Sequence, residues 1–159
     1  MGELKNQGRE RVQEHQEQYG EIQQEASEAI EERDRNLEVI RSLEGVDDDD
    51  KSAIEDGRGQ GKEIASQIAE SSIETPKNEV NTQVEATVTE MHGLETREEA
   101  DAGKAGGMDG NYGGVGSNLE SKFSASAAEF NDIASSGEEV KETSNAALEA
   151  MAQNLKMDW

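Results

Sequence analysis

The two histidines are the residues whose chemistry would be easiest to recognise. Val12 and Thr89 stand three places before His15 and His92. Neither histidine therefore belongs to a Glu-x-x-His pair of the kind that holds a di-iron centre in a helical bundle. Isolated polar residues of this type usually lie on solvated surfaces. We predict that both histidines are solvated and that the chain binds no metal through them.

The glycines do not form a recognisable phosphate-binding loop. Gly61-Lys62 and Gly103-Lys104 lack both the earlier Gly and the following Ser or Thr of a P-loop. The glycines at 57, 59 and 61 follow no predicted strand, which a dinucleotide fingerprint requires. We therefore expect no nucleotide and no other cofactor.

The run Asp47-Asp48-Asp49-Asp50 has two interpretations. It could hold a cation, but an EF-hand loop starting at Asp47 needs Gly and Glu where Ser52 and Arg58 stand. Alternatively it places negative charge at the start of a helix, which is favourable by about 0.3–1 kcal/mol. We favour the second interpretation and leave cation binding open. Since no nucleophile, base or carboxylate pair can be assembled elsewhere, we expect that the protein is not an enzyme.

Composition limits both the core and the partners. Of the 159 residues 31% are hydrophobic and 3% aromatic, against roughly 45–50% apolar in ordinary domains, so any core is thin. The net charge of -22 disfavours nucleic acid and anionic membranes. The chain has no Cys and no long apolar run, so we expect no membrane insertion. A cytoplasmic location follows, with export that needs no cleaved signal peptide as the alternative.

Apolar residues in the first part of the chain recur at helical spacing, which predicts a helix over about 5–44. Gly45 follows as a candidate C-cap. The stripe consists of Val12, Tyr19, Ile22, Ala26, Ile30, Leu37, Ile40 and Leu43.

A second helical segment is predicted over 52–74 and continues over 76–100. Ser52-Ala53-Ile54-Glu55 has the capping-box pattern of a helix start. Thr75-Pro76 has the pattern of an N-cap followed by Pro, so we expect a restart or kink there. The glycines between 57 and 61 predict a loose turn or the close approach of another helix. The two stripes are Ile54, Gly57, Gly61, Ile64 and Ile68, then Val80, Val84, Val88 and Met91.

The Gly-rich stretch 102–116 is typical of a flexible connection. Ser117-Asn118-Leu119-Glu120 is a second capping box, which predicts a last helix over 117–157. Small residues around Gly137 would let another helix approach closely. The stripe of this helix is Leu119, Phe123, Ser126, Phe130, Ile133, Gly137, Val140, Ser144, Ala147 and Met151.

Together these segments predict an all-α fold. Three long helical segments joined by two turns form an elongated antiparallel bundle, and the second segment is kinked at Pro76. We expect a single elongated helical domain over 1–159.

The sequence Tyr112-Gly113-Gly114, with Ser117 to Phe123 on a new helix, resembles the aromatic-x-Gly turn of WXG-type helical hairpins. The resemblance covers about residues 90–157. WXG-type proteins and the helical partners of LXG toxins use the bacterial type VII secretion pathway. The resemblance therefore implies an adaptor, chaperone or secreted partner.

We expect an α-helical interaction protein that binds another helical chain, the same or different, because long stripes accompany a sparse core. The alternatives are a hydrophilic stress-protective or solvating chain and a structural subunit of a phage or injection assembly. Trp159 could close the end of the bundle or anchor a partner. The candidate partner-binding residues are Tyr112, Gly114, Phe123, Phe130, Gly137, Met151, Trp159, Gly57 and Gly61.

Overall fold

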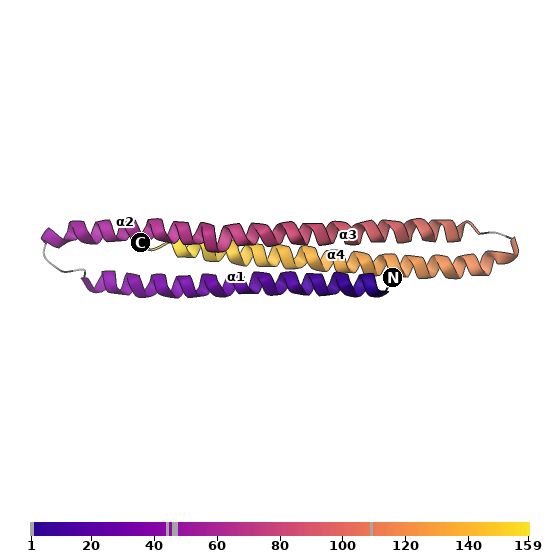
Figure 1. Ribbon diagram of the computed structural model, residues 1–159, viewed down its shortest axis with the longest axis horizontal. Coiled ribbons are helices and arrows are strands. Elements are labelled where there is room, and N and C mark those ends of the chain that lie inside the picture. Colours follow the sequence, from indigo (N-terminus) through magenta and orange to yellow (C-terminus); the bar gives the residue numbers. More distant parts are fainter. Residues whose placement is uncertain (1, 44, 46–47, 109) are drawn as a thin grey trace. The chain divides into compact units, whose positions relative to one another are not determined.

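The structure is a computed structural model that describes residues 2–43, 45, 48–108 and 110–159, and Figure 1 traces the chain. The described residues form helices and short connections without any strand, so the predicted all-α class is confirmed. In chain order the elements are α1 (Gly2–Leu43), α2 (Asp48–Ile68), the π-helical segment η1 (Ala69–Glu74), α3 (Thr75–Gly106), the 3-10 segment η2 (Gly110–Tyr112) and α4 (Gly113–Lys156).

Two helices begin earlier than predicted, and both predicted capping boxes are wrong. α2 starts at Asp48 and α4 starts at Gly113, so Ser52 and Ser117 lie inside helices. The Ser117 carbonyl accepts a hydrogen bond from the Ser121 hydroxyl at 2.9 Å. Asp residues then occupy the first turn of α2, where negative charge is favourable. Asp47 lies outside the described residues.

Most of the stretch predicted as a flexible loop, 102–116, is helical. α3 continues to Gly106, and α4 begins at Gly113. The glycines allow the two helix ends to come close together. A Cβ atom at Gly116 would lie 2.7 Å from the Ala105 carbonyl oxygen and 2.9 Å from Met108 Cβ. The sequence signal that predicted flexibility therefore reflects close packing.

The predicted break at Thr75-Pro76 takes the form of a π-helical turn. Thr75 is itself helical, with φ −63° and ψ −51°, and donates its backbone N–H to the Glu70 carbonyl. It does not have the extended backbone of the predicted N-cap. Proline at position 76 cannot donate a backbone hydrogen bond and its ring crowds the preceding turn. The wider winding of η1 lies immediately before that position.

The described chain forms two compact units, and the first combines Met1–Gln16 with Asn81–Glu142. A Cβ atom at Gly8 of α1 would contact Met91 and Ile133. One turn further along α1, Val12 and Val88 surround Gly137. Within this unit α1 and α4 therefore run in the same direction and α3 runs against them. Phe130, Met91 and Val84 are fully buried in its core.

The second unit combines Glu17–Val80 with Thr143–Trp159. Its largest buried side chains are Tyr19, Ile73, Leu148 and Leu155. In the predicted stripe of α1, the residues of this unit up to Leu37 are buried except Ile30, which is half-buried. Ile40 is also half-buried, and Leu43 is 45% exposed. In α2 the predicted seam residue Ile64 is 55% exposed, while the adjacent Ala65 is buried.

Candidate partner-binding surfaces

An apolar groove lies between the end of α1 and the start of α2 in the second unit. It encloses about 350 Å³ and is lined by the α1–α2 groove residues Ile40, Leu43, Asp50, Ala53, Ile54 and Gly57. Leu43 is 45% exposed, and the neighbouring Val39 is 58% exposed. Large apolar side chains that lie together on a surface commonly mark a site of interaction.

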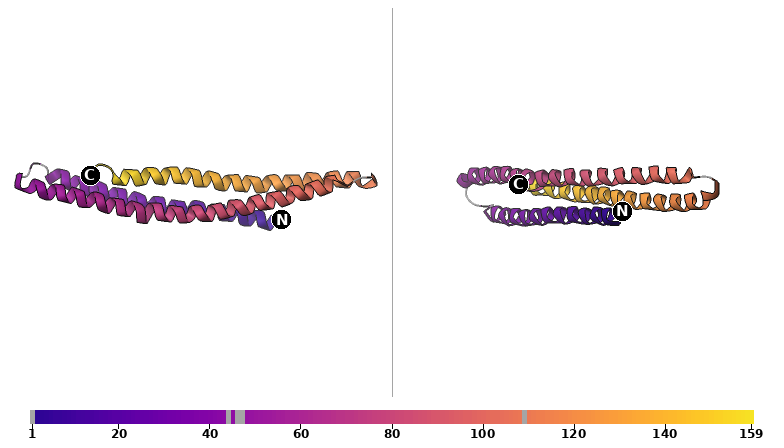
Figure 2. Two further views of the ribbon diagram at one scale, coloured as in Figure 1. Left: turned by 90° about the horizontal axis from the view of Figure 1, so that it is seen from above. Right: turned by 45° about the vertical axis from the view of Figure 1, so that its right-hand side comes forward.

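The α1–α2 groove is open because α4 does not extend along it. α4 ends at Lys156, and the chain then folds so that the Trp159 ring lies against Gly61. Figures 1 and 2 show that α4 ends before the turn between α1 and α2. Between the start of α2 and Gly61, the described part of this unit therefore contains only α1 and α2, without α4.

Arg33 of α1 holds the end of α4 in position. Its side chain is only 6% exposed. It donates hydrogen bonds to the Asn154 carbonyl and, at 2.6 Å, to Asn154 Oδ1. A further bond of 3.2 Å reaches the Met157 carbonyl. The last carbonyl groups of a helix lack partners within the helix. The Asn154 carbonyl, in the last turn of α4, accepts from Arg33 as well as from the Met157 backbone N–H at 3.0 Å. Arg33 also places a cation near the negative end of the helix dipole.

Trp159 is half-buried, and hydrogen bonds hold both its side chain and its backbone oxygen. Its indole Nε1 donates to the Leu155 carbonyl at 3.3 Å, and Arg58 Nη1 donates to the Trp159 backbone oxygen at 3.3 Å. A Cβ atom at Gly61 would lie 2.2 Å from the ring, so only glycine leaves space for it. The preceding Asp158 has φ +70°, which lets the chain turn back. Of the two predicted roles, these contacts fit closure of the bundle end.

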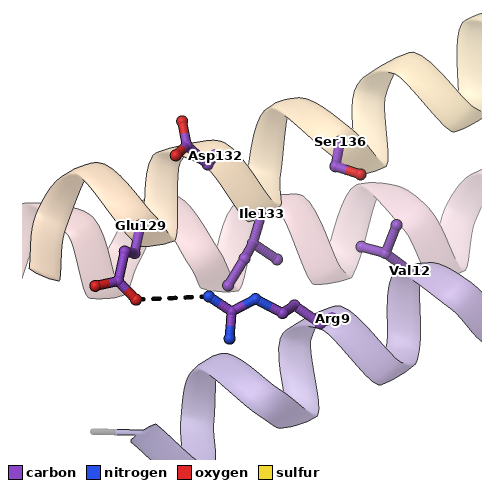
Figure 3. A pocket seen from close by; sticks show the side chains of 6 residues that line it. All are labelled: Arg9, Val12, Glu129, Asp132, Ile133 and Ser136. Atoms are coloured by element: carbon purple, nitrogen blue, oxygen red, sulfur yellow. Dashed lines mark hydrogen bonds and ion pairs between the residues drawn. The ribbon is translucent and has the colours of Figure 1, made fainter.

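A second groove lies between α1 and α4 of the first unit and encloses about 290 Å³ (Figure 3). Val12 and Ile133 form its apolar part. Arg9 pairs with Glu129 across it at 3.5 Å, and Asp132 lines one side. The ion pair bridges the two helices over apolar residues, so this groove is already partly covered by its own side chains.

The histidines differ from the prediction in one case. His15 is buried, and its Nε2 lies 2.9 Å from the Thr87 hydroxyl oxygen. The predicted solvated position is therefore wrong for His15, because Thr87 of α3 provides a polar partner inside the first unit. His92 is exposed as predicted and lies 2.8 Å from Glu95 on the same helix.

A buried carboxyl group in the first unit has no hydrogen-bond partner. Glu98 is 1% exposed, and neither of its carboxyl oxygens has a partner. The hydroxyl of Ser126 is also buried and unpartnered. The contacts of Gly106 with Glu120 and of Gly137 with Val88 fix the antiparallel register of α3 and α4. In this register Glu98 of α3 lies approximately opposite Ser126 of α4.

Ion pairs on the helix surfaces shift the pKa of a few groups. Arg11 donates two hydrogen bonds to the Glu90 carboxylate, which lowers the pKa of Glu90 from its ordinary value of 4.5. Burial by itself would lower the pKa of Lys77, but hydrogen bonds and charge from Glu74 and Glu149 raise it overall. Both clusters connect different helices of one unit. They therefore contribute to the packing of these helices.

The predicted partner-binding residues lie in three different environments. Phe130 and Gly137 are buried in the core of the first unit. Phe123 and Met151 are half-buried. The exposed residues are Tyr112 and Gly114, beside the turn between α3 and α4, and Gly57 in the α1–α2 groove.

Three lining residues of the α1–α2 groove were not predicted as partner contacts. Ile40, Leu43 and Ile54 belonged to predicted stripes and were assigned to the interior. Their position in the sequence distinguishes them, because they lie near the turn between α1 and α2. Whether a third helix covers that end depends on its register, which the stripes alone do not fix.

The described residues contain no cluster of three or more His, Cys, Asp or Glu side chains suited to a metal ion. None of the described helices is both long enough and apolar enough to cross a membrane. Comparison with protein-family models, curated proteins and solved structures gave no match to the chain. The geometry of the surfaces therefore carries the functional argument.

Proposed function

We propose that this chain is a non-enzymatic interaction protein that binds a helix of another protein chain in the α1–α2 groove. The supporting observation is that α1 and α2 carry apolar side chains at the end of the unit where α4 does not pack against them. Ile40, Leu43 and Ile54 line a groove that α4 does not cover. An amphipathic helix laid into such a groove buries its apolar stripe and restores three-helix packing.

We also propose a role as an adaptor or chaperone in type VII-like export of a bacterial toxin. Its support is the Tyr112-Gly113-Gly114 turn, in which η2 ends and α4 begins. Tyr112 is 67% exposed, so its ring is available to a partner. Co-expression with a toxin encoded beside this gene tests the proposal. Export should fall when the chain is deleted, and unchanged export would refute this role.

Site-specific photo-cross-linking in the native host tests binding at the groove. A photoreactive residue replaces Ala53, which lines the groove, or Glu55, which is exposed and does not line it. Both positions lie on α2 and differ mainly in the face they occupy. We expect a defined protein adduct at position 53 and little at position 55.

Reconstitution with the captured protein then decides the case. We expect the purified pair to form a complex that Ile54→Glu weakens by at least about tenfold, because a buried charge would enter an apolar contact. Equal cross-linking at both positions, or a complex insensitive to Ile54→Glu, would show that the groove is not the binding site.

A further inference from the structure

We infer that the occupant of the α1–α2 groove is the same groove of a second copy of this chain, in an antiparallel arrangement. The two copies are related by a two-fold axis that passes near Ile54, so each α2 packs against the α2 of the other copy. This inference rests on the proposed function, because it identifies the partner of the same surface. It concerns only the second unit of each copy.

The length of the open segment fits this arrangement. α2 begins at Asp48, and the Trp159 ring covers Gly61. The uncovered part of α2 therefore spans about 20 Å at 1.5 Å per residue. Ile54 lies at its midpoint. A two-fold axis there lets the open segment of each copy cover that of the other over its whole length.

The charges along α2 select the antiparallel direction. Asp50 lies four residues before Ile54, and Arg58 lies four residues after it. An antiparallel two-fold places Asp50 of each copy beside Arg58 of the other, which gives two equivalent pairs. Arg58 Nη1 also donates to the Trp159 backbone oxygen, and a guanidinium group has five N–H donors to share between such partners. A parallel arrangement would bring Asp50 beside Asp50 and Arg58 beside Arg58. Opposite charges in register favour one arrangement, and like charges disfavour the other.

The apolar residues suit close packing about the axis. Ile54 would meet its counterpart, and Ile40 and Leu43 of α1 would flank it. A Cβ atom at Gly57 would meet nothing within 4 Å in the single chain. Glycine at that position lets a second helix approach closely. The result is a local four-helix bundle made from two identical helix pairs.

Light scattering coupled to size-exclusion chromatography, with the full chain over a concentration series, tests the arrangement. We expect a monomer–dimer equilibrium. Asp50→Arg should raise the dissociation constant at least about tenfold, because two attractive pairs become repulsive. Asp50→Asn, which removes the attraction without adding repulsion, should weaken the dimer by a smaller factor. Asp56→Arg is the matched control, because it changes the net charge equally at an exposed position outside the groove.

A cysteine cross-link tests the axis directly, because the chain has no Cys. Ala53→Cys and Glu55→Cys each lie one residue from the proposed axis, but only position 53 lines the groove. Mild oxidation should give a covalent dimer with Ala53→Cys and little with Glu55→Cys. Equal dimer yields at the two positions, or an Asp56→Arg change as damaging as Asp50→Arg, would overturn the arrangement.

Failure of this inference can be separated from failure of the proposed function. A protein that stays monomeric at all concentrations, yet binds a different helical chain through position 53, overturns self-association and supports the function. A monomer that captures no chain at position 53 overturns both. A dimer that forms but does not respond to Asp50→Arg places the contact on another face and overturns the antiparallel pairing.

Discussion

Replacing Glu98 with Met should stabilise the protein, although it changes a fully buried residue. Both carboxyl oxygens of Glu98 are buried without a partner. A buried polar group that lacks hydrogen bonds costs roughly 1–3 kcal/mol, and a charged one costs more. Met has a similar length and helix propensity and fills the same space with apolar atoms.

The expected gain is at least about 2 kcal/mol in the free energy of unfolding. Urea denaturation followed by circular dichroism measures it, because for an m-value of about 2 kcal/mol/M the midpoint should rise by about 1 M. Glu99→Met is the matched control, since Glu99 is exposed on the same helix. Its effect should remain within about 0.5 kcal/mol.

Ser126→Ala extends the test, because the Ser126 hydroxyl is also buried and unpartnered. We expect a smaller gain of roughly 1 kcal/mol, since one neutral group is removed. A lower midpoint for Glu98→Met, with the Glu99→Met control unchanged, would refute the reasoning. It would show that the carboxyl group makes favourable contacts in solution.

Two glycine substitutions in α2 should affect Trp159 differently, and the effect of a substitution at Glu90 should depend on pH. Gly61→Ala should displace the Trp159 ring from α2 and shift the emission of this single Trp to the red. Gly59→Ala, at an exposed position that does not line the groove, should leave the emission unchanged and add about 0.5–1 kcal/mol of stability. Glu90→Gln should lower stability slightly at pH 7. Because Arg11 lowers the pKa of Glu90 in the folded state, this difference should shrink as the pH falls below 4.5 and disappear in stronger acid. A red shift with Gly59→Ala, or a pH-independent effect of Glu90→Gln, would contradict these assignments.

The helices were largely predictable because their apolar residues repeat with helical spacing. Tyr19, Ala26, Val84 and Phe130 belong to predicted stripes, and all four are almost completely buried. Helix ends were less predictable. A capping box describes a local preference, and the acidic run before Ser52 and the glycines before Ser117 allowed each helix to begin four residues earlier.

The surfaces were harder to predict because they depend on register between helices. Ile40 and Leu43 have the spacing of core residues, but they lie beyond the point where α4 ends. Glu98 and His15 have polar side chains, which composition assigns to the surface, and both are buried. Their positions follow from which helices lie opposite them, information that no single stripe contains.

The π-helical turn η1 has a consequence for how this chain tolerates insertions and deletions. Ala65, Ala69, Ile73 and Lys77 are all buried at a constant interval of four residues. In a regular α-helix each such interval drifts by about 40°, and the wider winding of η1 absorbs this drift. Removal of one residue from η1 would let this segment rewind as an ordinary α-helix, and eleven steps of about 100° differ from three full turns by only about 20°. Lys77 would then stay on the same helix face as Ala65, so we expect the chain to tolerate loss of one residue from η1 without a change in which α3 residues are buried.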